Sequence, residues 1–232
     1  MGLYARLILK LFAPIVLVGF IQPAIAVQVR RVVTDAGIVL RLSGGITNGD
    51  YLRLKHILQN DAVVGLEIRS GGGSLEAGVD IARVVRDRGL VVYASKECDS
   101  VCAFILFAAR KRFVGQGCKI GVHSVSNERG KEDSGSARIT IEMSRLLAGL
   151  GVPLSIVGKI VTTPPAKITF LNNRDLASLN VQRTNPFRSI YDAASLARTQ
   201  HAEAVCSLRV DLETLAGEGS CTTAQARASE AK

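Results

Sequence analysis

The amino-acid sequence predicts an α/β fold, because segments with strand and helix patterns take turns along the chain. Residues 27–33 and 38–42 alternate in the manner of strands and flank Asp35-Ala36-Gly37, which predicts a hairpin. Three consecutive glycines, Gly71 to Gly73, then separate a buried-type strand from a helix that Ser74 can cap. These observations favour a layered domain of the βα type.

The remaining elements follow from local periodicity and from Gly, Pro and capping residues. Further strands are expected at residues 63–68, 90–94 and 120–125. Helices are expected at residues 50–58, 74–88, 100–109, 139–150 and 172–179. Between them, residues 95–99 are predicted to form a polar loop and residues 126–137 an exposed insertion.

The first 26 residues have the pattern of a cleavable secretory signal. Arg6 and Lys10 precede an apolar run at residues 11–21, and Ala24-Ile25-Ala26 matches the small-x-small site that signal peptidases cut. We therefore expect a periplasmic or secreted protein, cleaved after Ala26. The alternative is an N-terminal membrane anchor, but Pro14 interrupts the run, and roughly 20 apolar residues are normally needed to span a bilayer.

Removal of this leader leaves 206 of the 232 residues, enough for one domain at residues 27–190 and a partly helical tail at residues 191–232. The leader holds two basic and no acidic residues, so 27 basic and 20 acidic residues remain, a net charge of +7. Anionic lipid or cell-wall polymer suits this charge, although a basic solvated surface is the simpler interpretation. Nucleic acid is not expected as a partner, because aromatic residues are few and Trp is absent.

The five cysteines all follow the leader: Cys98, Cys102, Cys118, Cys206 and Cys221. Exported proteins keep disulfides, and an odd count leaves at least one thiol unpaired within the chain. A bond between Cys206 and Cys221 would tie down the tail. A metal site built from the first three cysteines and His123 is conceivable, but the spacing matches no common zinc pattern. No metal ion and no cofactor are expected.

The glycine loop and Ser100 are the candidates for chemistry. The loop leaves backbone N–H groups unshielded at the start of a helix, where they can stabilise an oxyanion. A tight turn is the plain alternative, and a phosphate cradle lacks the Lys-Ser/Thr of a P-loop. Ser100 stands where a loop enters an apolar helix, as an N-cap or as a nucleophile. His123, in a following strand, is either a core residue or the base that deprotonates Ser100.

Four segments together carry a resemblance to a known family. Residues 69–78 read RSGGGSLEAG, residues 100–106 read SVCAFIL, and Arg112-Phe113 and Val122-His123 follow in order. They resemble the proteolytic subunit of Clp protease and its crotonase-fold relatives, and most closely an exported branch with a Cys-x-Ser-x-Cys nucleophile segment. The resemblance covers roughly residues 38–181. It implies the ClpP/crotonase-type fold, a superhelical domain of repeated ββα units.

This resemblance implies an exported serine peptidase or related acyl hydrolase acting on a peptide or acyl substrate. The family's Ser-Pro-Gly-Gly loop falls on residues 70–73, its nucleophile on Ser100 and its catalytic histidine on His123. Backbone N–H groups of Gly72, Gly73 and Val101 would form the oxyanion hole. Relatives assemble into rings or trimers, and residues 139–150 lie where Clp subunits project a helix for ring contacts. No unfolding ATPase is expected as a partner, because ATP is scarce outside the cytoplasm.

The sequence departs from the family at the third catalytic residue. The family's acid falls just before Phe170-Leu171, where this chain has Ala166-Lys167-Ile168-Thr169 and no carboxylate. Asp175 is nearby, at a helix position that is not catalytic in relatives. A Ser-His dyad, an acid from elsewhere and an inactive site all stay open, and so does the alternative of a non-catalytic binding or assembly protein.

The cysteines around Ser100 fit more than one interpretation. A bond between Cys98 and Cys102 would brace the nucleophile turn, or either could pair with Cys118. Cys102 could also act as the nucleophile, although relatives have a small packed residue at that position.

Overall fold

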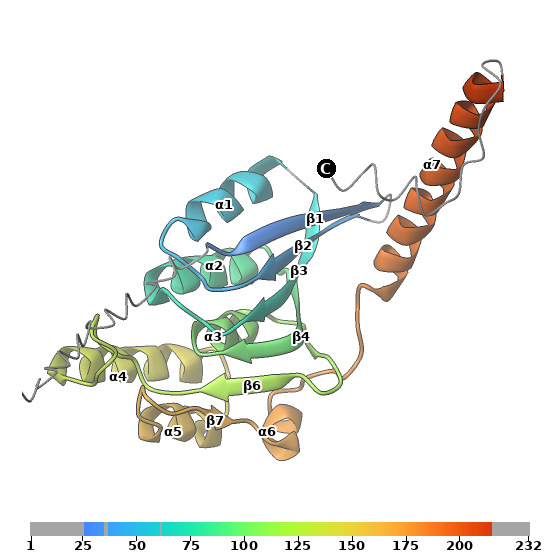
Figure 1. Ribbon diagram of the computed structural model, residues 1–232. Helices are drawn as coiled ribbons and strands as arrows, with labels where there is room; N and C mark the ends of the chain where they lie inside the picture. The colour runs from blue at the N-terminus through green and yellow to red at the C-terminus, as the bar shows by residue number, and fades with distance from the viewer. Residues whose placement is uncertain (1–25, 35–36, 61, 215–232) are drawn as a thin grey trace, which may run out of the picture.

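A computed structural model describes residues 26–34, 37–60 and 62–214, and these residues form an α/β domain around one mixed sheet (Figure 1). The strands are β1 Gln28–Thr34, β2 Gly37–Ser43, β3 Val63–Ser70, β4 Val91–Asp99, β5 Arg112–Val114, β6 Lys119–Val122 and β7 Thr169–Phe170. The helices are α1 Asp50–Asn60, α2 Leu75–Asp87, α3 Val101–Ala108, α4 Ser134–Gly149, α5 Leu154–Thr162, α6 Asn173–Ser178 and α7 Arg188–Thr214.

The sheet is parallel in its centre and antiparallel at its two edges. Its order is β1-β2-β3-β4-β6-β7, and β5 pairs with β4 beside this path. Strands β2, β3, β4 and β6 run parallel, whereas β1 and β7 are antiparallel to their neighbours. Parallel strands bring their carboxyl ends to one edge of a sheet, and ligands bind there in open α/β folds.

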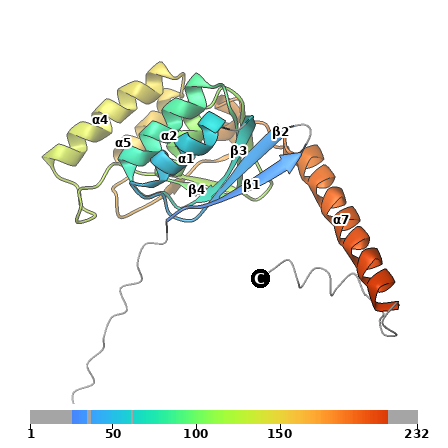
Figure 2. The ribbon, with the colours of Figure 1, turned by 90° about the horizontal axis from the view of Figure 1, so that it is seen from above.

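Helix α3 lies at the centre of the core. All eight of its residues are buried, and Phe107 is among the largest fully buried side chains. A helix that is apolar on every side needs partners on every side, and α3 packs against α2, α4, β3, β4 and β6. Figure 2 shows α1, α2, α4 and α5 gathered on one side of the sheet.

Helix α7 packs on the sheet through its first turns and then extends away from the domain (Figures 1 and 2). The Phe187 ring, just before α7, lies edge-on to Tyr93, with ring centroids 6.4 Å apart. The Tyr191 hydroxyl donates to the Glu67 carboxylate, which also pairs with Arg41 at 2.8 Å. The helix expected in the tail is therefore present, and it begins before the proposed boundary at residue 191.

Most of the predicted elements are confirmed, including the hairpin, the helix capped by Ser74 and the helix capped by Asn172. The predicted loop at residues 95–99 is wrong, because β4 continues through it to Asp99. Pairing of Glu97 with Lys119 and of Asp99 with Gly121 holds this polar segment as a strand. Tertiary pairing has overridden local composition here.

Further elements differ from the sequence-based expectation: strand β7 was not predicted, and β6 ends at Val122 rather than at residue 125. Helix α4 begins at Ser134, inside the expected insertion, because Asp133 and Ser136 form a capping box. Strand β5 and helix α5 were not predicted. Among the described residues, no helix is long and apolar enough to cross a membrane. The signal sequence falls almost wholly outside the described residues, and so does Cys221.

Candidate active site

Ser100 is the link between β4 and α3, and its backbone is strained. Its φ of 58° and ψ of −124° lie outside the conformations that side-chain-bearing residues ordinarily adopt. The Ser100 N–H donates to the Gly121 carbonyl at 2.9 Å, and the Ser100 carbonyl accepts from Phe104 at 3.2 Å. Its hydroxyl makes no capping bond, although Ser100 occupies the N-cap position. Strained residues between a strand and a helix are typical of presented nucleophiles.

Two glycines allow other elements to approach this turn closely. A Cβ at Gly72, whose φ is 103°, would lie 2.7 Å from the Ser100 Cβ. A Cβ at Gly78 would lie 2.0 Å from a methyl group of Val101. Larger residues at either position would push the glycine loop or α2 away from α3.

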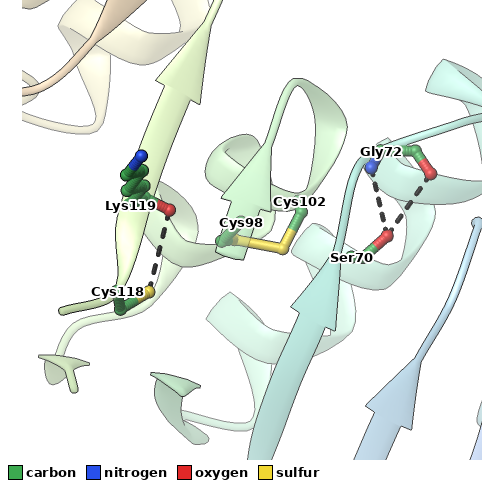
Figure 3. Close-up of a disulfide and its surroundings, with 6 residues drawn as sticks. All are labelled: Ser70, Gly72, Cys98, Cys102, Cys118 and Lys119. Carbon is green, nitrogen blue, oxygen red and sulfur yellow. Dashed lines mark hydrogen bonds between the residues drawn. A yellow bond between two sulfur atoms is a disulfide. The ribbon is translucent and has the colours of Figure 1, made fainter. Parts of the chain in front are cut away.

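The glycine loop is fixed by backbone pairing with Ile46. The Ile46 N–H donates to the Gly72 carbonyl at 2.9 Å, and the Ile46 carbonyl accepts from Ser74 N–H at 2.7 Å. This parallel bridge directs the N–H of Gly73 to the opposite side. The Gly72 N–H donates to the Ser70 hydroxyl at 3.1 Å (Figure 3). Of the two glycines proposed for the oxyanion hole, Gly73 therefore has the N–H that is not engaged in these contacts.

Most of the proposed site residues meet in one cleft of about 180 Å³, but Gly72 is not among the residues that line it. Gly73, Ser100, Val101 and His123 all line it. Most of its wall is apolar, made of Leu75, Phe104, Phe107, Val122, Met143, Leu147 and Ile160. Val101 is the first residue of α3, so its N–H has no carbonyl one turn back within the helix. The cleft thus combines a hydroxyl, an imidazole and backbone donors with an apolar surface.

His123 follows β6 and is held by a backbone contact. Its Nδ1 lies 2.7 Å from the carbonyl oxygen of Ser124. Because a carbonyl only accepts hydrogen bonds, this contact requires the proton on Nδ1 and leaves the Nε2 lone pair free in the neutral ring. That tautomer is the one a general base acting through Nε2 needs. Ser124 itself is fixed, since its N–H donates to Thr163 at 2.8 Å.

The segment in which relatives carry their acid contains an exposed Lys167. Asp175, the nearest carboxylate downstream in sequence, is occupied in the structure. It accepts from the Asn172 N–H at 2.8 Å and forms an ion pair with Lys159. Burial raises the pKa of Asp175, but Lys159 and the Asn172 N–H outweigh it and hold that pKa below the ordinary value. Asp175 therefore stabilises the start of α6.

Cys98 and Cys102 lie together near Ser100, and Cys118 lies apart from them (Figure 3). Cys98 and Cys102 face each other, with Cα atoms 5.1 Å apart and sulfur atoms at bonding distance. Cys118 is a buried thiol beside the Lys119 carbonyl, and burial raises its pKa to about 11. Within the described ranges, no three His, Cys, Asp or Glu side chains are placed to hold a metal ion.

Two groups near the site were not singled out from the sequence. The Ser124 carbonyl leaves no sequence signal, because every residue has one. Asp99 carries a signal in hindsight, as a carboxylate directly before the nucleophile candidate in a segment that was expected to be a loop. In the structure it ends β4 and is 8% exposed.

No protein-family model and no curated protein matches the chain. Among solved structures, ClpP1 from Listeria monocytogenes matches with 20% identity and a TM-score of 0.50, over 63% of this chain and 91% of that one. A mutant of the same protein matches with 19% identity and a TM-score of 0.50, over 64% and 92%. A mutant of a membrane-bound stomatin-specific protease matches with 17% identity and a TM-score of 0.48, over 63% and 79%. At these identities the ClpP1 structures establish the architecture alone, so the fold expected from the sequence is confirmed and the chain has a ClpP-like fold.

Proposed function

We propose that this protein is a serine peptidase or related acyl hydrolase in which Ser100 is the nucleophile and His123 the general base. The observation that carries the proposal is the strained Ser100 backbone at a strand–helix junction, with a hydroxyl that makes no capping bond and a histidine in the same cleft. Backbone strain of this kind costs about 1–3 kcal/mol and persists where function requires it.

The reaction would follow from the positions of these groups. As Ser100 Oγ bonds to the substrate carbonyl carbon, its proton passes to His123 Nε2 and the carbonyl π electrons move to oxygen. The N–H groups of Gly73 and Val101 would stabilise that oxyanion, and removal of one such donor typically slows a hydrolase about a hundredfold. The leaving group departs with the proton from His123, and water, activated by His123, then releases the acyl group from Ser100.

The cleft supports a peptide or acyl substrate with an apolar group beside the scissile carbonyl. Phe104, Met143 and Leu147 line the cleft that holds Ser100. Apolar area transferred from water to this wall contributes about 25 cal/mol per Å² to binding. We further propose that the protein is exported, as the leader predicts, and that it acts without an unfolding ATPase.

A fluorophosphonate probe tests the proposal, because it reacts with activated serines. The protein from Val27 to Lys232 should be labelled. Labelling should vanish in Ser100→Ala and fall at least about a hundredfold in His123→Ala, since an unassisted hydroxyl is a weak nucleophile. Ser126→Ala is the matched control, because Ser126 is an exposed serine at the same cleft. It should label like the wild type.

The alternative is a binding or assembly protein that keeps the fold without catalysis. The specific observation in its favour is the exposed Lys167 in the segment where relatives have an acid. Folded wild-type protein that stays unlabelled while a control hydrolase reacts would support this alternative.

A further inference from the structure

Asp99 is a buried carboxylate with one oxygen that the described part of the fold leaves without a hydrogen-bond partner. It directly precedes Ser100, is 8% exposed, and its Oδ1 has no hydrogen-bond partner among the described residues. Burial of a charged oxygen without a partner is costly, and native proteins retain such groups where they serve a purpose. Asp50 and Asp175 are as deeply buried, yet each is surrounded by donors.

The neighbouring strand leaves room for this carboxylate. Asp99 pairs with Gly121 across β4 and β6, and a Cβ at Gly121 would lie 2.4 Å from Asp99 Oδ1. The same Cβ would lie 2.5 Å from a methyl group of Ile168. Asp99 Oδ1 and the Ile168 methyl group therefore both lie beside Gly121, which brings the carboxylate near the segment just before β7. By the resemblance, the family's acid falls in that segment, and Asp99 brings a carboxylate near it from β4.

His123 lies two residues beyond Gly121, and residues two apart in an extended chain project to the same side. Charges around Asp99 come from several elements. Burial and Glu97 on β4 raise the pKa of Asp99, whereas the Gly121 N–H, His123 and Lys119 favour its ionised form. Cys118 completes this group as an uncharged thiol. Asp99 and His123 are thus close enough to act on each other.

We propose that Asp99 is the positioning residue of the site, supplying from β4 the negative charge that stabilises His123 when it takes the proton of Ser100. The inference rests on the proposed hydrolase function. In a Ser-His-Asp triad one carboxylate both orients the histidine and balances its positive charge, whereas here two groups share these roles. The Ser124 carbonyl fixes the tautomer of His123, and Asp99 balances the charge of the imidazolium.

Asp99→Asn tests the charge with little change in shape. Fluorophosphonate labelling of Ser100 should slow about tenfold, because the imidazolium that forms as Ser100 loses its proton is no longer stabilised by a negative charge. Asp99→Glu should recover part of the rate. Glu97→Gln is the matched control, because Glu97 is an exposed carboxylate on the same strand. It should label within about twofold of the wild type.

The free energy of unfolding of Asp99→Asn distinguishes the proposed role of Asp99 from a structural one. The pKa of Asp99 is raised in the folded protein, so folding favours the protonated form and the charged form costs stability at neutral pH. Asp99→Asn should therefore be at least as stable as the wild type at pH 7, an advantage that fades as the pH falls through the Asp99 titration. A carboxylate kept for structure would show the reverse, and marked loss of stability in Asp99→Asn would overturn the inference.

An NMR titration of the Asp99 carboxyl carbon tests the coupling without any activity. In His123→Gln this titration should move to higher pH, because the imidazolium that favours the carboxylate is gone. An unchanged titration would refute the inference even if Ser100 is reactive. Wild-type labelling at Ser100 together with an equal labelling rate in Asp99→Asn would refute it as well. Absent labelling with an intact Asp99–His123 coupling would instead refute the hydrolase function.

Discussion

Ser100 shows how one residue can be held in an unfavourable conformation by its surroundings. Its N–H is bound to Gly121, its carbonyl to Phe104, and Gly72 closes over its Cβ. Each contact belongs to a different element, so relaxation of the turn would disrupt several of them together. A protein tolerates such a site when the rest of the fold stabilises it.

The strain predicts a stability difference between two substitutions of Ser100. Ser100→Gly should be more stable than Ser100→Ala by about 1 kcal/mol, because glycine adopts a positive φ freely whereas alanine keeps the Cβ. Denaturant unfolding of both variants measures the difference. Equal stability, or a more stable alanine variant, would mean that the backbone at residue 100 is not strained.

The contacts of Asp50 are the basis of a second prediction at the scale of single residues. It is 1% exposed and accepts from the Thr47 N–H at 2.6 Å and the Val27 N–H at 3.2 Å. Burial raises the pKa of Asp50, but these donors and Arg53 outweigh it, so the pKa is lowered. Its contribution to stability is therefore present above the pKa of an unfolded aspartate and is lost as the pH falls through the folded value.

If export cleaves the chain after Ala26, the new α-ammonium group of Val27 would face this carboxylate. Protein with a free Val27 amine should then melt about 3 °C higher near pH 6 than protein acetylated at Val27, since charge strengthens the hydrogen bond. The difference should vanish above about pH 8–9, as the amine loses its proton, and at low pH, as Asp50 gains one. Equal melting temperatures at pH 6 would show that the amine does not pair with Asp50.

At the scale of elements, the sequence was informative wherever local chemistry decides the structure. Ser74 and Asn172 begin helices because their side chains accept N–H groups of the first turn. Residues 95–99 could not be predicted, because Glu97 and Asp99 are in a strand only through pairing with β6. Helix α5 was missed since Pro153 and Pro164 indicate its limits but not the conformation between them.

The same contrast between local chemistry and tertiary geometry holds for the candidate site. Ser100 and His123 were singled out by the resemblance, through the order and spacing of its motifs, and both line one cleft, while their catalytic roles stay predictions. The Ser124 carbonyl could not, because its role depends on the geometry of the backbone. Nor could the burial of Asp99, because it depends on the absent side chain of Gly121 on another strand.

The junction of β4 and α3 predicts a role for Cys98 and Cys102, which flank Ser100. In protein kept from reductant, alkylation should leave both cysteines unmodified. After reduction of a bond between them, fluorophosphonate labelling of Ser100 should slow about tenfold, because small displacements of a nucleophile are costly. Cys118→Ala is the control, since Cys118 is a buried thiol outside this bond. Five free thiols in unreduced protein, or labelling unaffected by reduction, would contradict this.

At the scale of the whole molecule, apolar side chains remain exposed on the helices beside the cleft. On α4, Ile141 is 50% exposed and Leu146 is 45% exposed, while Leu154 on α5 is 77% exposed. Exposed apolar side chains can belong to an interface when they form a contiguous patch. The resemblance of the sequence to Clp subunits implies ring contacts in the segment that α4 contains, and this stays an expectation.

We therefore predict that residues 27–232 assemble into an oligomer through α4. Light scattering should give a mass above that of one chain, and Ile141→Glu with Leu146→Glu should reduce it, because charges are costly in an apolar interface. Glu142→Ala, on the same helix, is the control and should leave the mass unchanged. A clean monomer of the wild type would remove the assembly hypothesis.

The central claim is that the fold presents Ser100 as an activated nucleophile, and the measurement that tests it most directly is the location of a fluorophosphonate adduct. Wild-type protein from Val27 to Lys232 should gain one adduct, and peptide mapping by mass spectrometry should place it on Ser100. An adduct on another residue, or none on folded protein under conditions that label a control hydrolase, would contradict the account.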